Sequence, residues 1–127
     1  MLRLRQIAMV APDLAPVEEE VGQMLAAEVC YRDPGVGKYG LHNALWALGG
    51  TFLEALAPLQ ENTTAGRYMA RRGGATGYMV ILDTDAIAPW RTRAAALGIR
   101  EASFHQVAGY TGLQLHPRDR FGANGVP

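Results

Sequence analysis

Residues 6–13 of the chain read QIAMVAPD, and residues 78–85 read YMVILDTD. Both stretches show a strand-like apolar pattern that runs into a turn aspartate, and a helical pattern follows each of them. Gln6 therefore aligns with Tyr78, and Asp13 with Asp85, at a shift of 72 residues. A repeat at a fixed spacing predicts two copies of one supersecondary unit, so this repeat decides the fold.

The first copy occupies residues 1–58. Alternation over residues 2–10 predicts a strand with Gln6 and Ala8 on one face, and with Ile7 and Met9 on the other, turned toward the helices. Residues 17–28 predict a helix capped by Asp13. A short strand is expected over 28–32, with Cys30 buried in it, and a loop over 33–40. A hairpin that turns at Gly49 and Gly50 completes the unit. The predicted order is β-α-β-β-β.

The second copy follows a connector at residues 59–76, in which residues 64–72 predict a short helix ended by Gly73 and Gly74. A strand and a helix come next, and then strands over 99–107 and 110–117. A shift of 72 carries Glu54, on the predicted fourth strand, to position 126, and the sequence stops at Pro127. We therefore expect one domain over 1–127, with a first unit (1–58), the connector (59–76) and a second unit (77–127) that lacks its fourth strand. Whether the natural gene continues beyond Pro127 stays open.

Composition narrows the classes of partner. Lys and Arg number 12, as do Asp and Glu, so bulk charge does not favour binding to nucleic acid or to an anionic membrane. No secretory signal and no membrane-spanning stretch is recognisable. The chain has 1 cysteine, which cannot form an internal disulfide, so we expect a cytoplasmic protein.

The order of the elements, together with four segments, resembles the vicinal oxygen chelate superfamily. This superfamily includes glyoxalase I, methylmalonyl-CoA epimerase, extradiol dioxygenases and bleomycin resistance proteins. The segments are QIAMVAPDL (6–14), GGTFLEALAP (49–58), TTAGRYMARRGGATGYMVILDTD (63–85) and LHPRDRFG (115–122). The resemblance implies an α+β fold, in which two tandem β-α-β-β-β units, the second incomplete, form a cup-shaped mixed sheet around a small-molecule pocket.

The resemblance also implies a site for a divalent metal, with two ligands from each unit and open coordination positions facing the substrate. Gln6 and Glu54 stand at the two ligand positions of the first unit, and Glu54 would also serve as the general base. Tyr78, or Gly77 if the register slips by one, stands where the second unit should offer histidine. Because two of four ligands remain, we expect either no cofactor or a weakly bound divalent metal. His105 and His116 are the candidate replacement ligands.

The residues expected to line the pocket are Gln6, His42, Asn43, Trp46 and Tyr78. Several have a plainer interpretation, and Tyr78 could be an ordinary strand residue. Gln6 could be a half-exposed strand residue, as could Glu54; His42 could be an ordinary loop histidine, and Trp46 could belong to the core or to an interface.

Two classes of function remain. The preferred one is a small-molecule-binding protein without a full metal site, as in metal-free members that sequester antibiotics. The alternative is a metal-dependent lyase, isomerase or dioxygenase that uses Gln6 and Glu54. In both cases we expect a homodimer, because the strand over 110–116 would leave an edge that no lysine blocks.

Overall fold

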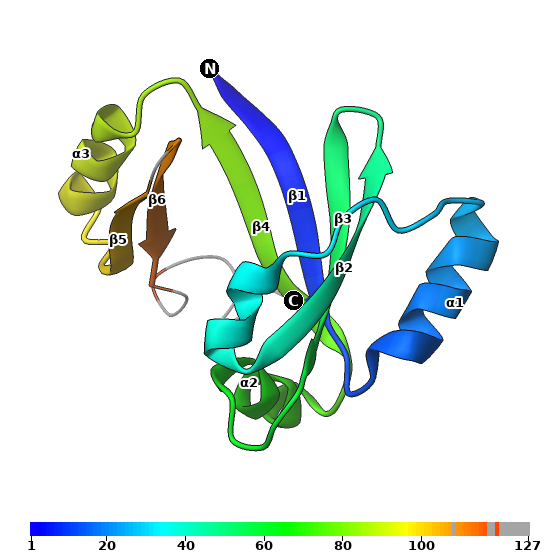
Figure 1. Ribbon diagram of the computed structural model, residues 1–127. Helices are drawn as coiled ribbons and strands as arrows, with labels where there is room; N and C mark the ends of the chain where they lie inside the picture. The colour runs from blue at the N-terminus through cyan, green and yellow to red at the C-terminus, as the bar shows by residue number, and fades with distance from the viewer. Residues whose placement is uncertain (108, 117–118, 120–127) are drawn as a thin grey trace. The chain divides into compact units, whose positions relative to one another are not determined.

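The computed structural model describes residues 1–107, 109–116 and 119. The chain divides into two compact units, one of residues Leu2–Asp83 and the other of Met1 with the chain from Thr84 onward. In the first unit, the elements in order are β1 (Leu2–Val10), α1 (Leu14–Leu25), the 3₁₀ helix η1 (Pro34–Tyr39), β2 (Leu41–Leu48), β3 (Thr51–Pro58), α2 (Thr64–Arg72) and β4 (Thr76–Thr84) (Figure 1).

The sheet of the first unit has the order β2-β3-β1-β4. β2 pairs antiparallel with β3 through the predicted hairpin, and Gly49 takes the left-handed φ of 63° that its turn requires. β1 pairs parallel with β3. β3 is therefore an internal strand, flanked by β1 on one side and by β2 on the other.

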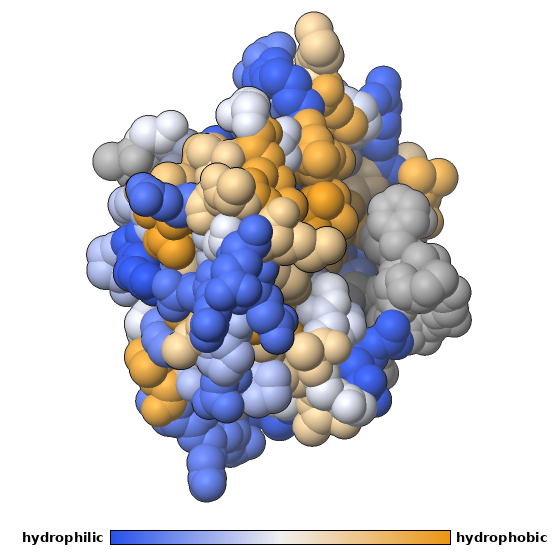
Figure 2. Space-filling model, turned by 90° about the vertical axis from the view of Figure 1, so that its right-hand side faces the viewer, coloured by the Kyte–Doolittle hydropathy of each residue, from blue (hydrophilic) through white to orange (hydrophobic). Residues whose placement is uncertain are grey.

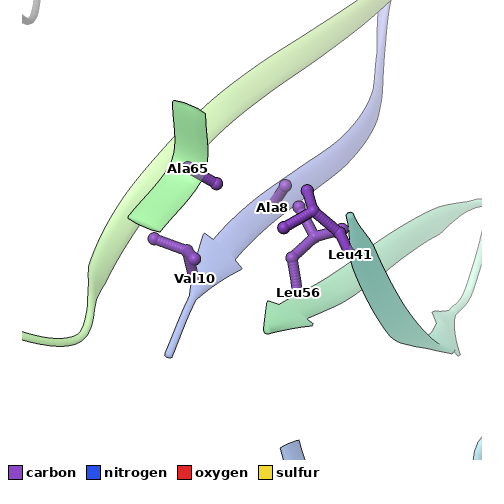
Figure 3. Packing of buried hydrophobic residues seen from close by; sticks show 5 residues of the cluster. All are labelled: Ala8, Val10, Leu41, Leu56 and Ala65. Carbon is purple, nitrogen blue, oxygen red and sulfur yellow. The ribbon is translucent and has the colours of Figure 1, made fainter. Parts of the chain in front are cut away.

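The two faces of this sheet carry separate hydrophobic clusters, because strand side chains alternate. Figure 3 shows the first cluster, in which Ala65 of α2 packs with Ala8, Val10, Leu41 and Leu56 from three strands. The second cluster lies on the opposite face, under α1, and its buried members are Leu14, Ala44, Trp46, Ala55 and Ala57. Met9 packs against this second cluster, as predicted for the face turned toward a helix.

The connector helix has the predicted limits. The Thr63 hydroxyl oxygen accepts a hydrogen bond of 2.9 Å from the Gly66 amide at the start of α2. At its end, Gly73 adopts the left-handed conformation, with φ of 85°. A side chain is unfavourable in this conformation, which explains why the helix ends at a glycine.

Four local predictions for the first unit are wrong. The helix expected over 17–28 begins and ends earlier in the chain, at Leu14–Leu25. The strand expected over 28–32 is reduced to a single antiparallel bridge between Tyr31 and Leu45. Asp13 occupies the position before α1, but its side chain makes no capping hydrogen bond. Cys30, expected to be buried in the short strand, is exposed. η1 begins at Pro34, so the pairing with β2 does not continue past the segment that follows the bridge.

The second compact unit contains α3 (Ala88–Ala96), β5 (Glu101–Val107) and β6 (Tyr110–Leu115). Together with β4, which precedes them in the chain, they follow the strand-helix-strand-strand order that the repeat predicts. β5 and β6 form an antiparallel pair. Arg100 binds Asp119 through its backbone amide and its guanidinium, at 2.8–2.9 Å, and holds the pKa of this carboxyl well below its ordinary value. The predictions for residues 117–118 and 120–127, including the end of the LHPRDRFG turn and the position of a fourth strand, lie outside the described residues.

Mixed helices and strands make this an α+β protein, as predicted. Within the described part of the chain, no helix is long and apolar enough to cross a membrane. Figure 2 shows hydrophobic and hydrophilic residues side by side on one face of the molecule. Exposed large hydrophobic residues include Met24 and Leu25 at the end of α1.

The core under α1 depends on Trp46, which is 0% exposed. We predict that Trp46→Ala lowers the free energy of unfolding by about 3–5 kcal/mol, because it removes the largest buried side chain of the sheet and leaves a cavity. Urea denaturation followed by circular dichroism measures the change. Leu48→Ala is the control, because Leu48 ends the same strand and is 43% exposed; it should cost about 1 kcal/mol or less. Leu48 lies on the same face as Trp46 but at the exposed end of the strand, so equal losses in the two variants would contradict the assignment of Trp46 to the core.

Candidate functional site

The candidate site is built around the Glu54 carboxylate, in the middle of the internal strand β3. This residue is 7% exposed, and a carboxylate that is buried so far is costly unless hydrogen bonds compensate it. Gln6 Nε2 donates to Glu54 Oε1 at 2.8 Å. Asn43 Nδ2 donates to Glu54 Oε2 at 2.6 Å. Each carboxylate oxygen is therefore held by one side-chain amide, from β1 and from β2.

Strand register brings these three side chains together. Glu54 pairs directly with Ala8 of β1 and with Leu45 of β2. Gln6 and Asn43 each lie two positions from these partners, so they are the diagonal neighbours of Glu54 on the same face of the sheet. Diagonal neighbours are within reach of long polar side chains. The small Ala8 leaves the space over which the Gln6 side chain extends.

Both the oxygen and the nitrogen of the Asn43 side-chain amide form hydrogen bonds. Its Oδ1 accepts a hydrogen bond of 2.9 Å from the Asp33 backbone amide, so its nitrogen must point toward Glu54. Arg32 Nη1 also donates to the Asn43 backbone oxygen at 3.3 Å, and Arg32 forms an ion pair with Glu18 of α1. The segment before η1 therefore sets the orientation of the amide that holds the carboxylate.

Burial raises the pKa of the Glu54 carboxyl above its ordinary value. The hydrogen bonds from Asn43 and Gln6 act in the opposite direction, because they stabilise the ionised form, and the negative charge of Asp33 raises the pKa further. The net direction is upward, so burial outweighs the two amides. A carboxyl with a raised pKa beside a pocket is a typical functional group.

Glu54 opens onto a pocket of about 190 Å³. The pocket combines charged and polar groups with aromatic and aliphatic ones, and its lining consists of Arg5, Gln6, Tyr31, Asp33, Leu45, Phe52 and Glu54. Gln6 and Glu54 were predicted from the sequence. Asp33 was missed because the turn at Asp33-Pro34-Gly35 indicated only a loop, and Tyr31 was missed because it was assigned to the short strand over 28–32. Phe52 could have been found, since it shares the face of Glu54 on β3.

A second hollow, of about 320 Å³, is lined by Asn43 together with His42, Leu41, Arg32 and Leu59. Both hollows include Asp33. The structure therefore places His42 and Asn43 at a pocket wall, but His42 is not among the residues around Glu54.

The two aromatic residues predicted to line the pocket lie elsewhere. Trp46 is fully buried under α1, on the face opposite Glu54, because even-numbered and odd-numbered residues of β2 alternate. Tyr78 packs against the cluster near α2, with its ring 5.5 Å from the ring of Tyr68, and burial raises the pKa of its phenol. Neither residue is among those lining the two described pockets.

The donor set around Glu54 does not fit a divalent metal. Both of its oxygens accept amide hydrogens, and the Asn43 amide cannot turn its oxygen inward without losing the bond from Asp33. Among the residues that the structure describes, no group of three or more His, Cys, Asp and Glu side chains could hold a metal ion. His105 lies on β5, edge-on to Tyr110.

Solved structures share this fold. A methylmalonyl-CoA epimerase from Mycobacterium tuberculosis is 17% identical with a TM-score of 0.75, and the match covers 91% of this chain and 79% of that one. The Streptomyces coelicolor epimerase in complex with 2-nitronate-propionyl-CoA is 20% identical with a TM-score of 0.77, over 92% and 86% of the two chains. A hypothetical protein from Bacillus halodurans is 17% identical with a TM-score of 0.79, over 93% and 86%.

No protein-family model matches the sequence, and no curated protein matches it. The epimerases are members of the vicinal oxygen chelate superfamily. The structural likeness confirms the predicted fold, which is the one that these epimerases share.

The raised pKa of Glu54 predicts how stability depends on pH. In the folded protein the Glu54 carboxyl keeps its proton to a higher pH than in the unfolded chain, where the pKa is near 4.5. The protonated carboxyl therefore stabilises the fold at low pH, and this contribution to the free energy of unfolding is lost as pH rises from the pKa of the unfolded state through the pKa of the folded state. Glu54→Gln removes this contribution, and Gln6 can turn its amide to accept from the new side chain. We therefore predict that the stability of the variant, relative to wild type, increases with pH.

Urea denaturation of both proteins from about pH 4 to about pH 8 measures this difference. Glu61→Gln is the control, because Glu61 is exposed and its replacement should leave the difference flat. A flat difference for Glu54→Gln as well would show that the carboxyl titrates as an exposed one does.

Proposed function

We propose that this chain, which has the vicinal oxygen chelate fold, binds a small organic molecule in the pocket beside Glu54 without a tightly held metal ion. The observation that carries this proposal is the carboxylate itself. It is buried, held at both oxygens by Gln6 and Asn43, and turned toward a pocket that also contains aromatic and aliphatic side chains. Such a mixture of apolar walls and a few fixed polar groups is typical of ligand sites.

Two further observations support the proposal. Each oxygen of Glu54 already accepts one amide hydrogen, and the oxygen of Asn43 is engaged by the Asp33 amide, so the site offers a metal few ligands, which favours recognition by hydrogen bonding. The fold itself hosts ligands in other proteins, since the Streptomyces coelicolor epimerase was solved with 2-nitronate-propionyl-CoA. The single cysteine of the chain supports a reducing compartment, and we place the protein in the cytoplasm.

A second candidate function is an enzyme that moves a proton, such as a lyase or an isomerase. One observation favours it: burial raises the pKa of the Glu54 carboxyl, which makes its carboxylate a stronger base than an exposed one. In the metal-dependent form of this candidate, Gln6 and Glu54 would be ligands, and Gln6 would have to turn its amide oxygen toward the ion. A dioxygenase would need the same rearrangement.

The proposal predicts that the purified protein contains less than one metal ion per chain, and that the thermal stabilisation by a bound ligand depends on Glu54. Elemental analysis of protein purified without added metal should find well below one zinc, nickel or iron per chain. A thermal-shift screen of small organic molecules should find compounds that stabilise wild type and stabilise Glu54→Gln less, because the variant lacks the fixed charge. The matched control is Glu61→Gln, which should respond as wild type does.

The outcomes separate the two candidates. Near-stoichiometric metal would overturn the metal-free site and favour the metal-dependent enzyme. Compounds that stabilise wild type and Glu54→Gln equally would place the ligand outside this pocket.

We also propose that the protein is a homodimer. In the described part of the chain, β6 pairs with β5 alone, so its other edge offers unpaired backbone groups. β6 contains neither lysine nor proline, and it carries the apolar Leu113 and Leu115. Edges of this kind pair readily with a second chain.

Sedimentation velocity at micromolar concentration tests the dimer. Wild type should sediment as a dimer, and Gln114→Lys should shift it toward monomer, because lysine on an edge strand opposes pairing. Gln23→Lys on α1 is the charge-matched control and should leave the dimer intact. A wild-type monomer would contradict the proposal.

A further inference from the structure

The pocket beside Glu54 has an unequal distribution of charge. Two of its lining residues, Asp33 and Glu54, are acidic, and Arg5 is the basic residue among the described lining residues. The Arg5 guanidinium lies 3.3 Å from Asp83 Oδ2 of β4, so its charge is already compensated by a carboxylate that is not part of the lining. When Glu54 is ionised, the pocket therefore presents net negative charge to whatever enters it.

The apolar part of the lining is aromatic as well as aliphatic. Tyr31, Phe52 and Leu45 contribute to it, and Leu45 is buried. The electron-rich faces of aromatic rings attract cations, and they also pack against apolar groups. The volume of about 190 Å³ corresponds to roughly six water molecules at about 30 Å³ each, which limits the ligand to a small molecule or to one end of a larger one.

We propose that the ligand of this pocket is an organic cation, with an ammonium group bound by Asp33 and Glu54 and an apolar body against Tyr31, Leu45 and Phe52. This inference rests on the proposed ligand-binding function and adds the chemical class of the ligand. An ammonium group would donate to the lone pairs that Gln6 and Asn43 leave free on the Glu54 carboxylate. It would also relieve the repulsion between Asp33 and Glu54, which contributes to the raised pKa of Glu54.

The proposal has a defined pH dependence. The charged and titratable groups that face Glu54 across the pocket are Arg5 from β1, and Tyr31 and Asp33 from the segment before η1; Gln6 and Asn43 are neutral. Glu54 must lose its proton to attract the ammonium group. Affinity for a cation therefore rises as pH increases through the pKa of Glu54, and binding in turn lowers that pKa.

Three probes of one shape test the inference: benzylamine, benzyl alcohol and benzoate, which carry a positive, a neutral and a negative group on the same ring. Binding is followed by nuclear magnetic resonance of labelled protein, through the side-chain amide signals of Gln6 and Asn43. At pH 8, benzylamine should bind about tenfold or more tightly than benzyl alcohol, as expected for a charge-assisted hydrogen bond. Benzoate should bind more weakly than both.

Two variants assign the effect to the pocket charges. Asp33→Asn keeps the oxygen that accepts from the Gly35 amide and keeps the backbone amide that holds Asn43, so it removes charge without removing these contacts. This variant and Glu54→Gln should each lose most of the preference for benzylamine, whereas Glu61→Gln should keep it. Circular dichroism of each variant confirms that it is folded.

Each outcome bears on a different claim. Equal binding of benzylamine and benzyl alcohol, or tighter binding of benzoate, would overturn the cation inference and leave the ligand-binding function standing. A preference for benzylamine that survives in Asp33→Asn and Glu54→Gln would also overturn it. If none of the three probes shifts the Gln6 and Asn43 signals, the cation inference fails, and the proposed function of this pocket fails with it.

Discussion

A carboxylate in the middle of a sheet constrains everything around it. Glu54 is buried on the internal strand β3, and an ionised group in that place is stable only when its oxygens are hydrogen bonded. One donor comes from each neighbouring strand, Gln6 from β1 and Asn43 from β2. Both donors reach it only in the observed register, with β1 parallel and β2 antiparallel to β3. A slip of one residue would turn either amide to the face under α1.

The sequence predicted the parts of the fold that local chemistry determines. Gly49 and Gly50 indicated the hairpin, and Gly73 indicated the end of α2, because each depends on nearby residues alone. The order of the elements was indicated by a comparison along the chain, the repeat of QIAMVAPD as YMVILDTD. The strand expected over 28–32 failed, since its apolar residues resemble a strand, whereas only one bridge to β2 forms before η1 begins at Pro34.

The site was predictable in part. Gln6 and Glu54 could be identified because polar residues interrupt two apolar strands at positions that a known superfamily uses for ligands. Trp46 could have been excluded, since the turn at Gly49-Gly50 pairs Leu45 with Glu54 and so places Trp46 on the opposite face of the hairpin. The placement of Tyr78 needed the tertiary structure, because strand alternation alone does not say which residues of β4 are covered by α2. The contribution of Asp33 could not be predicted for a further reason. Asp33 acts on Asn43 through its backbone amide as well as through its charge. Almost any residue type can make a backbone hydrogen bond, so the sequence does not indicate one.

The two amides that hold Glu54 are not equivalent, and this difference determines where a proton can go. Asn43 is locked by the Asp33 amide, so its nitrogen always points at Oε2. Within the described structure, no comparable bond fixes the oxygen of Gln6, which can therefore exchange places with its nitrogen. Of the two amides, Gln6 is therefore the one that can turn its oxygen toward a protonated Glu54 and accept from it. This asymmetry favours Oε1, on the side of β1, over Oε2 as the oxygen that carries the proton, and it makes the orientation of Gln6 sensitive to the charge of the site.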